Sequence, residues 1–173
     1  MKGRKNMTVF ETERLLARRP RPSDADAFFD MFTDAQTCRD DGGYPPYTRK
    51  DETFLRDFDS LFEDYDGRFF LEEKQSGRLI GVMHLMPTSV PRRLEIGYVI
   101  HRAYRNRGYA TEAAGGLMRW VRRRDMADEI SASAYLFNSA SQRVIEKLGF
   151  APTGNAAKEA LSDICPVISI GDA

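Results

Sequence analysis

The sequence predicts a mixed α/β fold, in which helices pack on a central, mostly antiparallel sheet. Two observations predict it. Short runs of β-branched and aromatic residues alternate with longer segments whose apolar residues recur at helical spacing. Antiparallel strands come first, followed by a strand–helix–strand unit and then by a helix and a closing hairpin. This order requires a mixed sheet with helices on its faces, and we expect roughly six to seven strands and about four helices.

The first part of the chain is expected to form a strand and two helices. Residues 14–18 (R-L-L-A-R) are typical of a short strand. Ser23 is a suitable N-cap for the first helix. Residues 38–48 (C-R-D-D-G-G-Y-P-P-Y-T) are rich in Gly and Pro, so a loop is expected there. The second helix follows, with Phe54, Leu55, Phe58, Leu61 and Phe62 at helical spacing.

The rest of the chain alternates strands and helices. Residues 68–73 and 79–86 are expected to form a hairpin around a Gln-Ser-Gly turn, and residues 94–100 a third strand. Residues 111–121 then have the spacing of a helix. The last expected elements are a strand at residues 130–135, a helix at residues 139–148 and two closing strands.

Composition and charge limit the function classes. The 173 residues suffice for one domain with a sizeable core, and we expect a single domain over residues 1–173. Lys plus Arg and Asp plus Glu balance at 26 each, which disfavours nucleic acid or an anionic membrane as a partner. The N-terminus lacks the apolar segment of a secretory signal. Cys38 and Cys165 form no C-x-x-C motif, so we expect reduced thiols and a cytoplasmic location.

The most informative segment joins the strand of residues 95–100 to the helix of residues 111–121. The joining residues 105–110 (R-N-R-G-Y-A) are small, basic or tolerant of the left-handed backbone conformation. Such a loop leaves backbone N–H groups uncovered at a helix N-terminus, where the helix dipole favours negative charge. Its two arginines add bidentate donors. The segment therefore predicts a pyrophosphate-binding loop.

These residues resemble the GNAT superfamily of acyl-CoA N-acyltransferases. The family signature (Arg/Gln)-x-x-Gly-x-(Gly/Ala) is matched by Arg105, Gly108 and Ala110. The flanking E-I-G-Y and Y-A-T-E-A are similar to the branch of the ribosomal-protein N-terminal acetyltransferases (RimJ/RimL-like). Residues 138–150 resemble the family's N-x-x-S…K-x-G-F helix and turn. Asn106 stands where the family usually has Gly, and Asn tolerates the same backbone conformation.

The resemblance implies a GNAT fold with a splayed parallel strand pair, in which the pantetheine arm of acetyl-CoA would lie. It implies direct attack of a primary amine, a protein N-terminus or a small molecule, on bound acetyl-CoA in a ternary complex. No metal is expected, and the chain is expected to be a monomer or a homodimer. The implied cofactor-binding residues are Val99, Ile100, Arg105, Asn106, Arg107, Gly108, Tyr109, Ala110, Thr111, Asn138 and Ser141.

The chemistry requires a base for the amine and an acid for the departing thiolate. Glu95, at the start of the strand that precedes the loop, is the expected base. His101, which strand alternation places on the same face, is the alternative. Many family members use a tyrosine as the acid, but Ile145 occupies that position here. The resembling branch uses the serine of N-x-x-S, so Ser141 is the expected acid.

The acceptor amine is not identified by the sequence. The loop expected at residues 38–48 covers the acceptor groove in the family, and its carboxylates and aromatic rings would suit a cationic amine. Asp40, Asp41 and Tyr44, together with Glu95, are therefore the expected substrate-binding residues. The alternative reading is a non-catalytic acyl-CoA-binding sensor or docking module with the same fold. An intact loop supports both readings equally, whereas Glu95 and Ser141 favour the enzyme.

Overall fold

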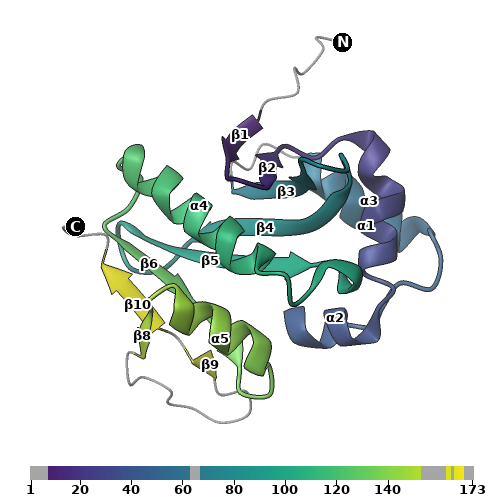
Figure 1. The fold of residues 1–173 in the computed structure, drawn as a ribbon. Coiled ribbons are helices and arrows are strands. Elements are labelled where there is room, and N and C mark those ends of the chain that lie inside the picture. Colours follow the sequence, from purple (N-terminus) through teal and green to yellow (C-terminus); the bar gives the residue numbers. More distant parts are fainter. Residues whose placement is uncertain (1–7, 63–66, 153–162, 165, 170–173) are drawn as a thin grey trace. The chain divides into compact units, whose positions relative to one another are not determined.

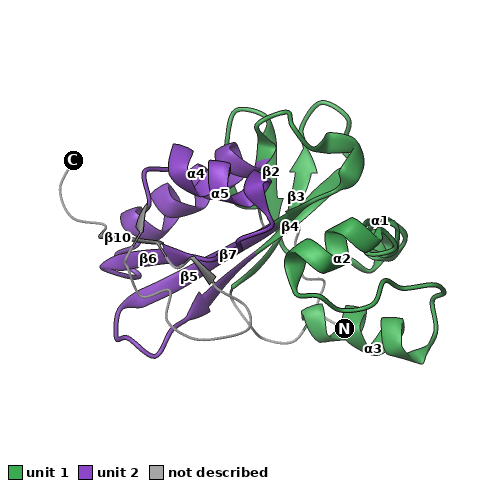
Figure 2. Ribbon diagram, turned by 90° about the horizontal axis from the view of Figure 1, so that it is seen from below, with its two compact units in different colours: residues 1–83, 99–109 green, residues 84–98, 110–173 purple. Residues whose placement is uncertain are grey.

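The computed structural model describes residues 8–62, 67–152, 163–164 and 166–169 of the chain (Figure 1). The chain divides into two compact units (Figure 2). The first consists of residues 1–83 and 99–109, and the second of residues 84–98 and 110–173. The boundaries fall inside two strands and at the first residue of a helix. Each unit is therefore described by itself.

The first unit contains an antiparallel set of strands with three α-helices grouped to one side of them (Figure 2). Its strands follow the order β1-β2-β3-β4. Its elements are β1 (Thr8–Glu11), β2 (Leu15–Arg18), the 3-10 turn η1 (Pro22–Asp24), α1 (Ala25–Met31), α2 (Ala35–Asp41), α3 (Glu52–Asp59), η2 (Ser60–Phe62), β3 (Arg68–Glu73), the first half of β4 (Leu79–Pro87), the end of β5 (Arg93–Ile100) and η3 (Arg102–Tyr104).

The core of the first unit is an aromatic cluster. The rings of Phe32, Phe54, Phe58 and Phe70 surround Phe28, with ring centroids between 4.7 and 6.3 Å from its own. Such ring pairs add to the stability that burial of their area provides. Of the residues noted at helical spacing in the sequence, Phe54 and Phe58 belong to this core, whereas Leu55 is 51% exposed.

The second unit contains the expected parallel strand pair. Its strands follow the order β4-β5-β6-β10-β8, with β7 and β9 paired separately. β5 and β6 are parallel, and their pairing ends at Ile96 and Ala132, although β5 continues to Ile100. The remaining elements of this unit are α4 (Tyr109–Arg123, from its second residue), β6 (Glu129–Ala132), β7 (Ala134–Tyr135), α5 (Ser139–Lys147), β8 (Ala151–Pro152), β9 (Asp163–Ile164) and β10 (Pro166–Ser169).

Helix α4 buries one face in the second unit. Ala113, Leu117 and Val121 recur every four residues and are fully buried, as expected for an amphipathic helix. Ile130 of β6 and Ile145 of α5 are buried in the same unit. The helix predicted at residues 111–121 is therefore confirmed, and it extends by two residues at each end.

Two local predictions are wrong. Ser23 does not cap a helix, because residues 22–24 form a 3-10 turn and α1 begins after Asp24. The loop predicted at residues 38–48 is helical as far as Asp41. The Asp34 side chain caps α2 by accepting from the Thr37 N–H at 3.0 Å, and the glycines that follow end the helix only at residue 42.

Three further differences concern strands. β1 was not predicted. The strand predicted at residues 130–135 is interrupted at Ser133, which separates β6 from β7. Of the closing region, residues 153–162 and Cys165 lie outside the described residues, as does the N-terminal segment 1–7 in which a signal sequence was considered. Cys38 has a free thiol and is buried.

A buried ion cluster ties β2 to the start of α1. The Arg18 side chain, 4% exposed, donates to both oxygens of Asp24 at 2.8 Å and to Glu72 Oε2 at 2.6 Å. Asp24 also accepts from the Arg21 N–H at 2.7 Å. The Arg18 guanidinium and the Asp24 carboxylate thereby satisfy each other's charge and hydrogen-bonding groups in a buried position.

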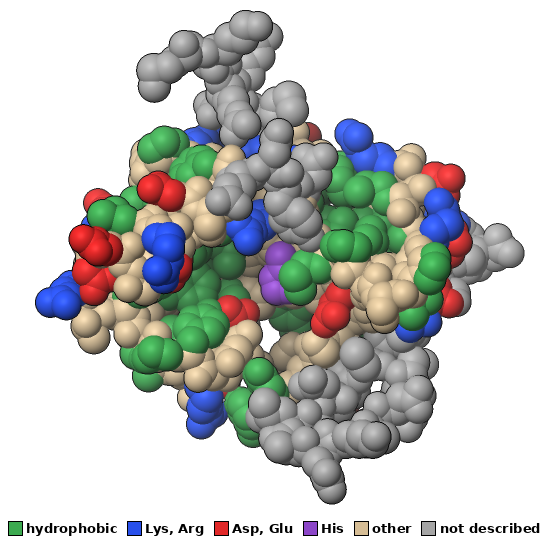
Figure 3. Space-filling model, turned by 180° about the vertical axis from the view of Figure 1, so that it is seen from behind, with side chains coloured by type: hydrophobic (Ala, Val, Ile, Leu, Met, Phe, Trp, Pro, Cys, Tyr) green, Lys and Arg blue, Asp and Glu red, His purple; other side chains and the backbone are tan. Residues whose placement is uncertain are grey.

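The surface carries interspersed charges. On the face drawn in Figure 3, acidic and basic side chains alternate, and no extended patch of one sign appears there. Within the described part of the chain, no helix has both the length and the apolar character that crossing a bilayer requires.

Candidate functional site

The loop of residues 105–108 exposes its backbone N–H groups. Asn106 and Gly108 both adopt the left-handed conformation, with φ of 61° and 80°, so the tolerance predicted for Asn106 is confirmed. The N–H groups of residues 106–109 donate to no other group in the described residues. Helix α4, 15 residues long, starts at Tyr109. Unpaired amides next to a helix N-terminus fit a pyrophosphate.

Arg14, in the turn between β1 and β2, contacts this loop. Its Nη1 donates to the Arg107 carbonyl at 3.0 Å, and its guanidinium lies 4.3 Å from the centroid of the Tyr109 ring. A Cβ on Gly108 would lie 3.5 Å from Arg14 Nη2. Arg14 therefore adds positive charge to the loop from a distant part of the chain.

Tyr109, the first residue of α4, is anchored by a buried carboxylate. Its hydroxyl donates to Glu73, which also accepts from Ser76 Oγ at 2.6 Å. The hydrogen bond from Ser76, followed by the one from Tyr109, holds the pKa of Glu73 below its ordinary value. The start of α4 is thus held by its hydrogen bond to the end of β3.

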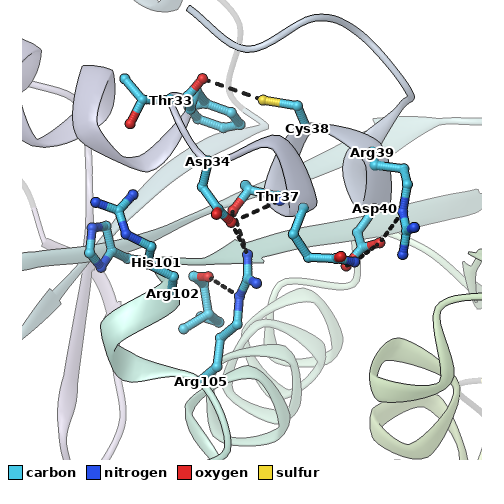
Figure 4. Close-up of polar contacts among 12 residues, drawn as sticks. Thr33, Asp34, Thr37, Cys38, Arg39, Asp40, His101, Arg102 and Arg105 are labelled. Carbon is cyan, nitrogen blue, oxygen red and sulfur yellow. Dashed lines mark hydrogen bonds and ion pairs between the residues drawn. The ribbon is translucent and has the colours of Figure 1, made fainter.

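The Arg105 side chain points toward Asp34 and Thr37 at the start of α2 (Figure 4). Its Nε donates to the Ile100 carbonyl at 3.1 Å, and its Nη2 contacts the Thr37 hydroxyl and, at 3.4 Å, Asp34. Hydrogen bonding from Thr37 lowers the pKa of Asp34, so this carboxylate stays charged beside the guanidinium. The Arg105 side chain fixes the base of the loop in the described structure.

The other expected cofactor-binding residues occupy strand and helix ends. Val99 and Ile100 end β5 and are each 8% exposed. Ala110 and Thr111 follow Tyr109 in the first turn of α4 and are half-buried. Asn138 caps α5, because its Oδ1 accepts from the Ser141 N–H at 3.0 Å.

Glu95 is a partly exposed residue of β5. Ser133 Oγ donates to its Oε1 at 2.7 Å, while Oε2 has no hydrogen-bond partner in the described residues. The neighbouring arginines pair elsewhere, Arg92 with Asp125 and Asp128 and Arg93 with Glu129. One carboxylate oxygen is thus oriented, and the other is available to accept a proton.

His101, the alternative base, has both ring nitrogens engaged within the first unit. Its Nε2 lies 2.7 Å from Asp30 Oδ2, and its Nδ1 accepts from the Ala103 N–H at 3.2 Å. The hydrogen bond from His101, with further donation from Arg102, lowers the pKa of Asp30. The contacts of His101 are those of a structural cap for η3.

Ser141, the expected acid, meets an aromatic hydroxyl. It lies half-buried in the first turn of α5, and its Oγ is 3.0 Å from the hydroxyl of Tyr98 in β5. The Tyr98 hydroxyl is also 3.4 Å from the Ser141 carbonyl oxygen. Burial raises the pKa of Tyr98 to about 12, and the hydrogen bond with Ser141 acts in the opposite direction.

His84 of β4 packs against Gly97 of β5, two residues along the strand from Glu95. A Cβ built on Gly97 would overlap the Cε1 and Nε2 atoms of the His84 ring. Residues 95 and 97 face the same side of a strand, so the His84 ring lies on the Glu95 side of β5. Glycine at position 97 provides the space that the ring occupies.

Gly97→Ala should destabilise the protein by about 1–3 kcal/mol, because the added methyl group overlaps the His84 ring. Chemical denaturation measures the change. In a His84→Ala background the same methyl has room, so the two substitutions should couple strongly. Gly81→Ala is the contrasting variant, since its Cβ would lie 2.6 Å from the Val99 carbonyl oxygen and no side-chain truncation relieves that. Equal losses from Gly97→Ala in both backgrounds would contradict this packing.

The expected acceptor-binding residues lie in and after α2. Asp40 accepts from Gln36 Nε2 at 2.7 Å and lies 3.6 Å from the Arg39 guanidinium. Asp41 accepts from the hydroxyl of Tyr44. The two carboxylates therefore belong to a helix rather than to the predicted irregular loop, and both are already hydrogen-bonded.

No group of three or more His, Cys, Asp or Glu side chains with metal-binding geometry occurs in the described residues. In the first unit, the unpaired loop amides and the Arg14 guanidinium form a region suited to an anion. The second unit contains the Glu95 carboxylate and the Tyr98–Ser141 pair of hydroxyls.

This chemistry agrees with the family comparison. The model of the acetyltransferase (GNAT) domain matches residues 14–151, so the chain belongs to the GNAT acetyltransferase family. The match includes the loop, Glu95 and Ser141. The resemblance in the loop and in the N-x-x-S segment is thereby confirmed.

Two uncharacterised N-acetyltransferases of Bacillus subtilis (strain 168) are similar in sequence. YoaA is 27% identical over 149 residues, which cover 84% of each chain. YjdG is 39% identical over 57 residues, which cover 33% of this chain and 34% of YjdG.

Solved structures share the fold. An acetyltransferase of the GNAT family from Bacillus anthracis aligns with a TM-score of 0.78 at 22% identity, covering 92% of this chain and 97% of its own. Spermidine N-acetyltransferase from Vibrio cholerae, in complex with CoA and spermine, aligns with a TM-score of 0.75 at 18% sequence identity, covering 90% of this chain and 95% of its own. Ribosomal-protein-S5-alanine acetyltransferase from Vibrio fischeri aligns with a TM-score of 0.68 at 19% sequence identity, covering 94% of this chain and 97% of its own.

Sequence reasoning did not find three residues that the structure brings to these groups. Arg14 contacts Arg107, which lies 93 residues further along the sequence. Ser133 and Glu95 are 38 residues apart in the sequence, and Tyr98 and Ser141 are 43 apart. Only Tyr98 had a sequence signal, since it belongs to the E-I-G-Y motif, but the motif does not indicate its partner.

Proposed function

We propose that this protein transfers the acetyl group of acetyl-CoA directly to a primary amine, with Glu95 as the base and Ser141 as the acid. The observation that carries the proposal is the set of unpaired amides at residues 106–109, next to the N-terminus of α4. Unpaired amides at a helix N-terminus favour an anion such as the CoA pyrophosphate, and Arg14 and Arg107 add positive charge beside them.

An alkylammonium with a pKa near that of lysine, about 10.4, is not a nucleophile, so the acceptor must lose one proton before it attacks and a second one as the amide forms. Glu95 Oε2 is available for this role, directly or through a water molecule, while Ser133 orients the carboxylate. His101 is less suited, since its Nδ1 lone pair already accepts from a backbone N–H. General acid–base assistance of this kind contributes roughly 10²–10⁴-fold.

The departing thiolate needs a proton, and Ser141 supplies a hydroxyl in the first turn of α5. Glu95 and Tyr98 lie on opposite faces of β5 by strand alternation. The base and the Ser141–Tyr98 pair are thereby kept apart, so they cannot neutralise each other by direct proton transfer.

The acceptor class is a primary amine, either a protein N-terminus or a small molecule. Asp40 and Asp41 remain proposed contacts for it, although their bonds to Gln36 and Tyr44 would have to be exchanged for bonds to the amine. Two structural relatives are described by their names as acting on spermidine and on ribosomal protein S5. Both kinds of acceptor therefore belong in the test.

The test is thiol release from acetyl-CoA in the presence of spermidine, an aminoglycoside, free amino acids and a peptide with an N-terminal alanine. We expect thiol release that depends on one acceptor and a product heavier by one acetyl group. Binding of acetyl-CoA with no transfer to any of them would favour the acyl-CoA sensor instead.

Gly108→Val should abolish most of the thermal stabilisation that CoA provides. Binding to the native state alone stabilises by about 2.7 kcal/mol at a hundredfold excess over Kd. The Val side chain would stand over the loop amides and is strained at a φ of 80°. Differential scanning fluorimetry with and without CoA measures the effect. Gly77→Val is the control, since Gly77 also has a positive φ, 66°, but lies in the β3–β4 hairpin. A CoA shift that survives in Gly108→Val would place the cofactor elsewhere.

A further inference from the structure

The Tyr98–Ser141 contact joins the proposed acid to a phenol whose proton the chemistry above does not use. It joins β5 to the first turn of α5 inside the second unit, with 3.0 Å between the two hydroxyl oxygens. Either oxygen can be the donor. The expected acid, Ser141, is therefore within hydrogen-bond distance of a second hydroxyl that can donate a proton, that of Tyr98.

We propose that Tyr98 positions and reprotonates Ser141, so that the two hydroxyls form a proton relay to the departing thiolate. This inference rests on the acetyl transfer proposed above and concerns the source of the proton. Tyr98 acts through Ser141 rather than on the substrate.

The amine nitrogen forms a bond to the carbonyl carbon of the thioester, the C–S bond breaks with its electron pair on sulfur, and the sulfur takes the proton of Ser141 Oγ. Ser141 Oγ takes the proton of the Tyr98 hydroxyl, which leaves a phenolate, and the phenolate recovers a proton from solvent. Glu95 takes one proton from the nitrogen as the amide forms and releases it to solvent, so transfer to a neutral amine consumes no net proton. An acceptor that arrives as an ammonium releases one further proton.

The acidity of the groups favours this order. An aliphatic hydroxyl is a poor acid by itself, whereas a phenol has an ordinary pKa of about 10, closer to that of a thiol at about 8.5. Burial raises the pKa of Tyr98 to about 12, so Tyr98 holds its proton more tightly than a free phenol does. A general acid works best when its pKa lies near that of the group it protonates and near the operating pH. Burial keeps Tyr98 protonated at neutral pH. Its proton is therefore in place when the thiolate forms.

The helix itself offers no phenol near its core-facing side. Ile145 of α5 is 4% exposed and has no proton to donate. The phenol that contacts this helix is Tyr98 of β5, so a phenolic proton reaches the helix only through the Ser141 contact in the described residues.

The competing arrangement is purely structural. In it the Tyr98 hydroxyl donates to the Ser141 carbonyl oxygen, 3.4 Å away, and accepts from Ser141 Oγ. Tyr98 would then only hold the helix. The two arrangements predict different proton counts in the chemical step.

The experiment is single-turnover acetyl transfer, with enzyme in excess over acetyl-CoA and with the best acceptor of the panel above. Tyr98→Phe should lower the rate by about 10-fold, a part of the full contribution of a general acid. In a Ser141→Ala background it should add less than about twofold, because the relay is already broken. The proton inventory in mixed H₂O and D₂O should be curved for the unaltered protein and linear for Tyr98→Phe.

Tyr135→Phe is the matched control. It removes a tyrosine hydroxyl from the same unit, where the ring stacks on Phe137 with centroids 5.0 Å apart, and it should leave the rate and the inventory unchanged. The CoA-induced thermal shift checks that every variant folds. If Tyr98→Phe does not fold, 3,5-difluorotyrosine at position 98 keeps the hydroxyl at a lower pKa and should move the alkaline limb of the rate profile to lower pH.

The outcomes separate the two proposals. A protein that binds acetyl-CoA but transfers to no acceptor refutes the proposed function and the relay with it. Transfer that is unaffected by Tyr98→Phe, or losses from Tyr98→Phe and Ser141→Ala that simply multiply, would overturn the relay alone. An unchanged alkaline limb with difluorotyrosine would do the same.

Discussion

Glu95→Gln is expected to lower kcat by roughly 10–10³-fold, within the usual range for loss of a general base. The amide keeps the shape of the side chain and can still accept from Ser133 Oγ, so only the ability to take a proton is lost. Steady-state kinetics with acetyl-CoA should show a lower kcat and a nearly unchanged KM for acetyl-CoA.

Glu129→Gln provides the matched control in the neighbouring parallel strand. Glu129 stands opposite Arg93, just as Glu95 stands opposite Ser131, and it forms an ion pair with Arg93. Loss of this partly exposed pair should cost little. Full activity of Glu95→Gln across pH would eliminate Glu95 as the base.

Arg18→Met is expected to destabilise the protein by about 3–5 kcal/mol, the usual cost of removing one member of a buried ion pair. The substitution leaves the Asp24 carboxylate, at a side-chain exposure of only 7%, without its guanidinium partner, and leaves Glu72, at 15%, with only the Arg21 guanidinium at 3.3 Å. Denaturation in guanidinium chloride or urea measures the loss, with the midpoint read at constant m.

Two further variants test the cause of that loss. Arg49→Met removes an arginine whose side chain is 80% exposed and whose partner is Asp51, so it should change stability by less than about 1 kcal/mol. Adding Asp24→Asn to Arg18→Met removes one of the stranded charges and should recover part of the stability. A loss below about 1.5 kcal/mol for Arg18→Met would contradict the burial of the ion cluster.

The sequence predicted best what is encoded locally. The loop at residues 105–110 has a short pattern of left-handed and small residues before a helix, and its backbone angles follow that pattern. The helical spacing of Phe54 and Phe58 likewise reflects the face of α3 that is buried.

The misses have two physical causes. Residues 38–41 were predicted as loop because Gly and Pro residues follow them. They are helical because α2 begins earlier, at Ala35, where the Asp34 side chain caps it. At residues 22–24, the Asp24 side chain engages Arg18 and the Arg21 N–H, so the chain makes a 3-10 turn before α1. Contacts such as Tyr98–Ser141 join residues distant in sequence, and no single-chain pattern specifies them.

Asn106 has a thermodynamic consequence for the loop. Glycine, which the family usually has at this position, samples many backbone conformations in a flexible loop, whereas asparagine samples fewer and still tolerates the φ of 61° seen here. A loop with fewer states loses less conformational entropy when a ligand orders it. Part of the conformational entropy that the loop would lose on binding the proposed phosphate is therefore already lost when the protein folds.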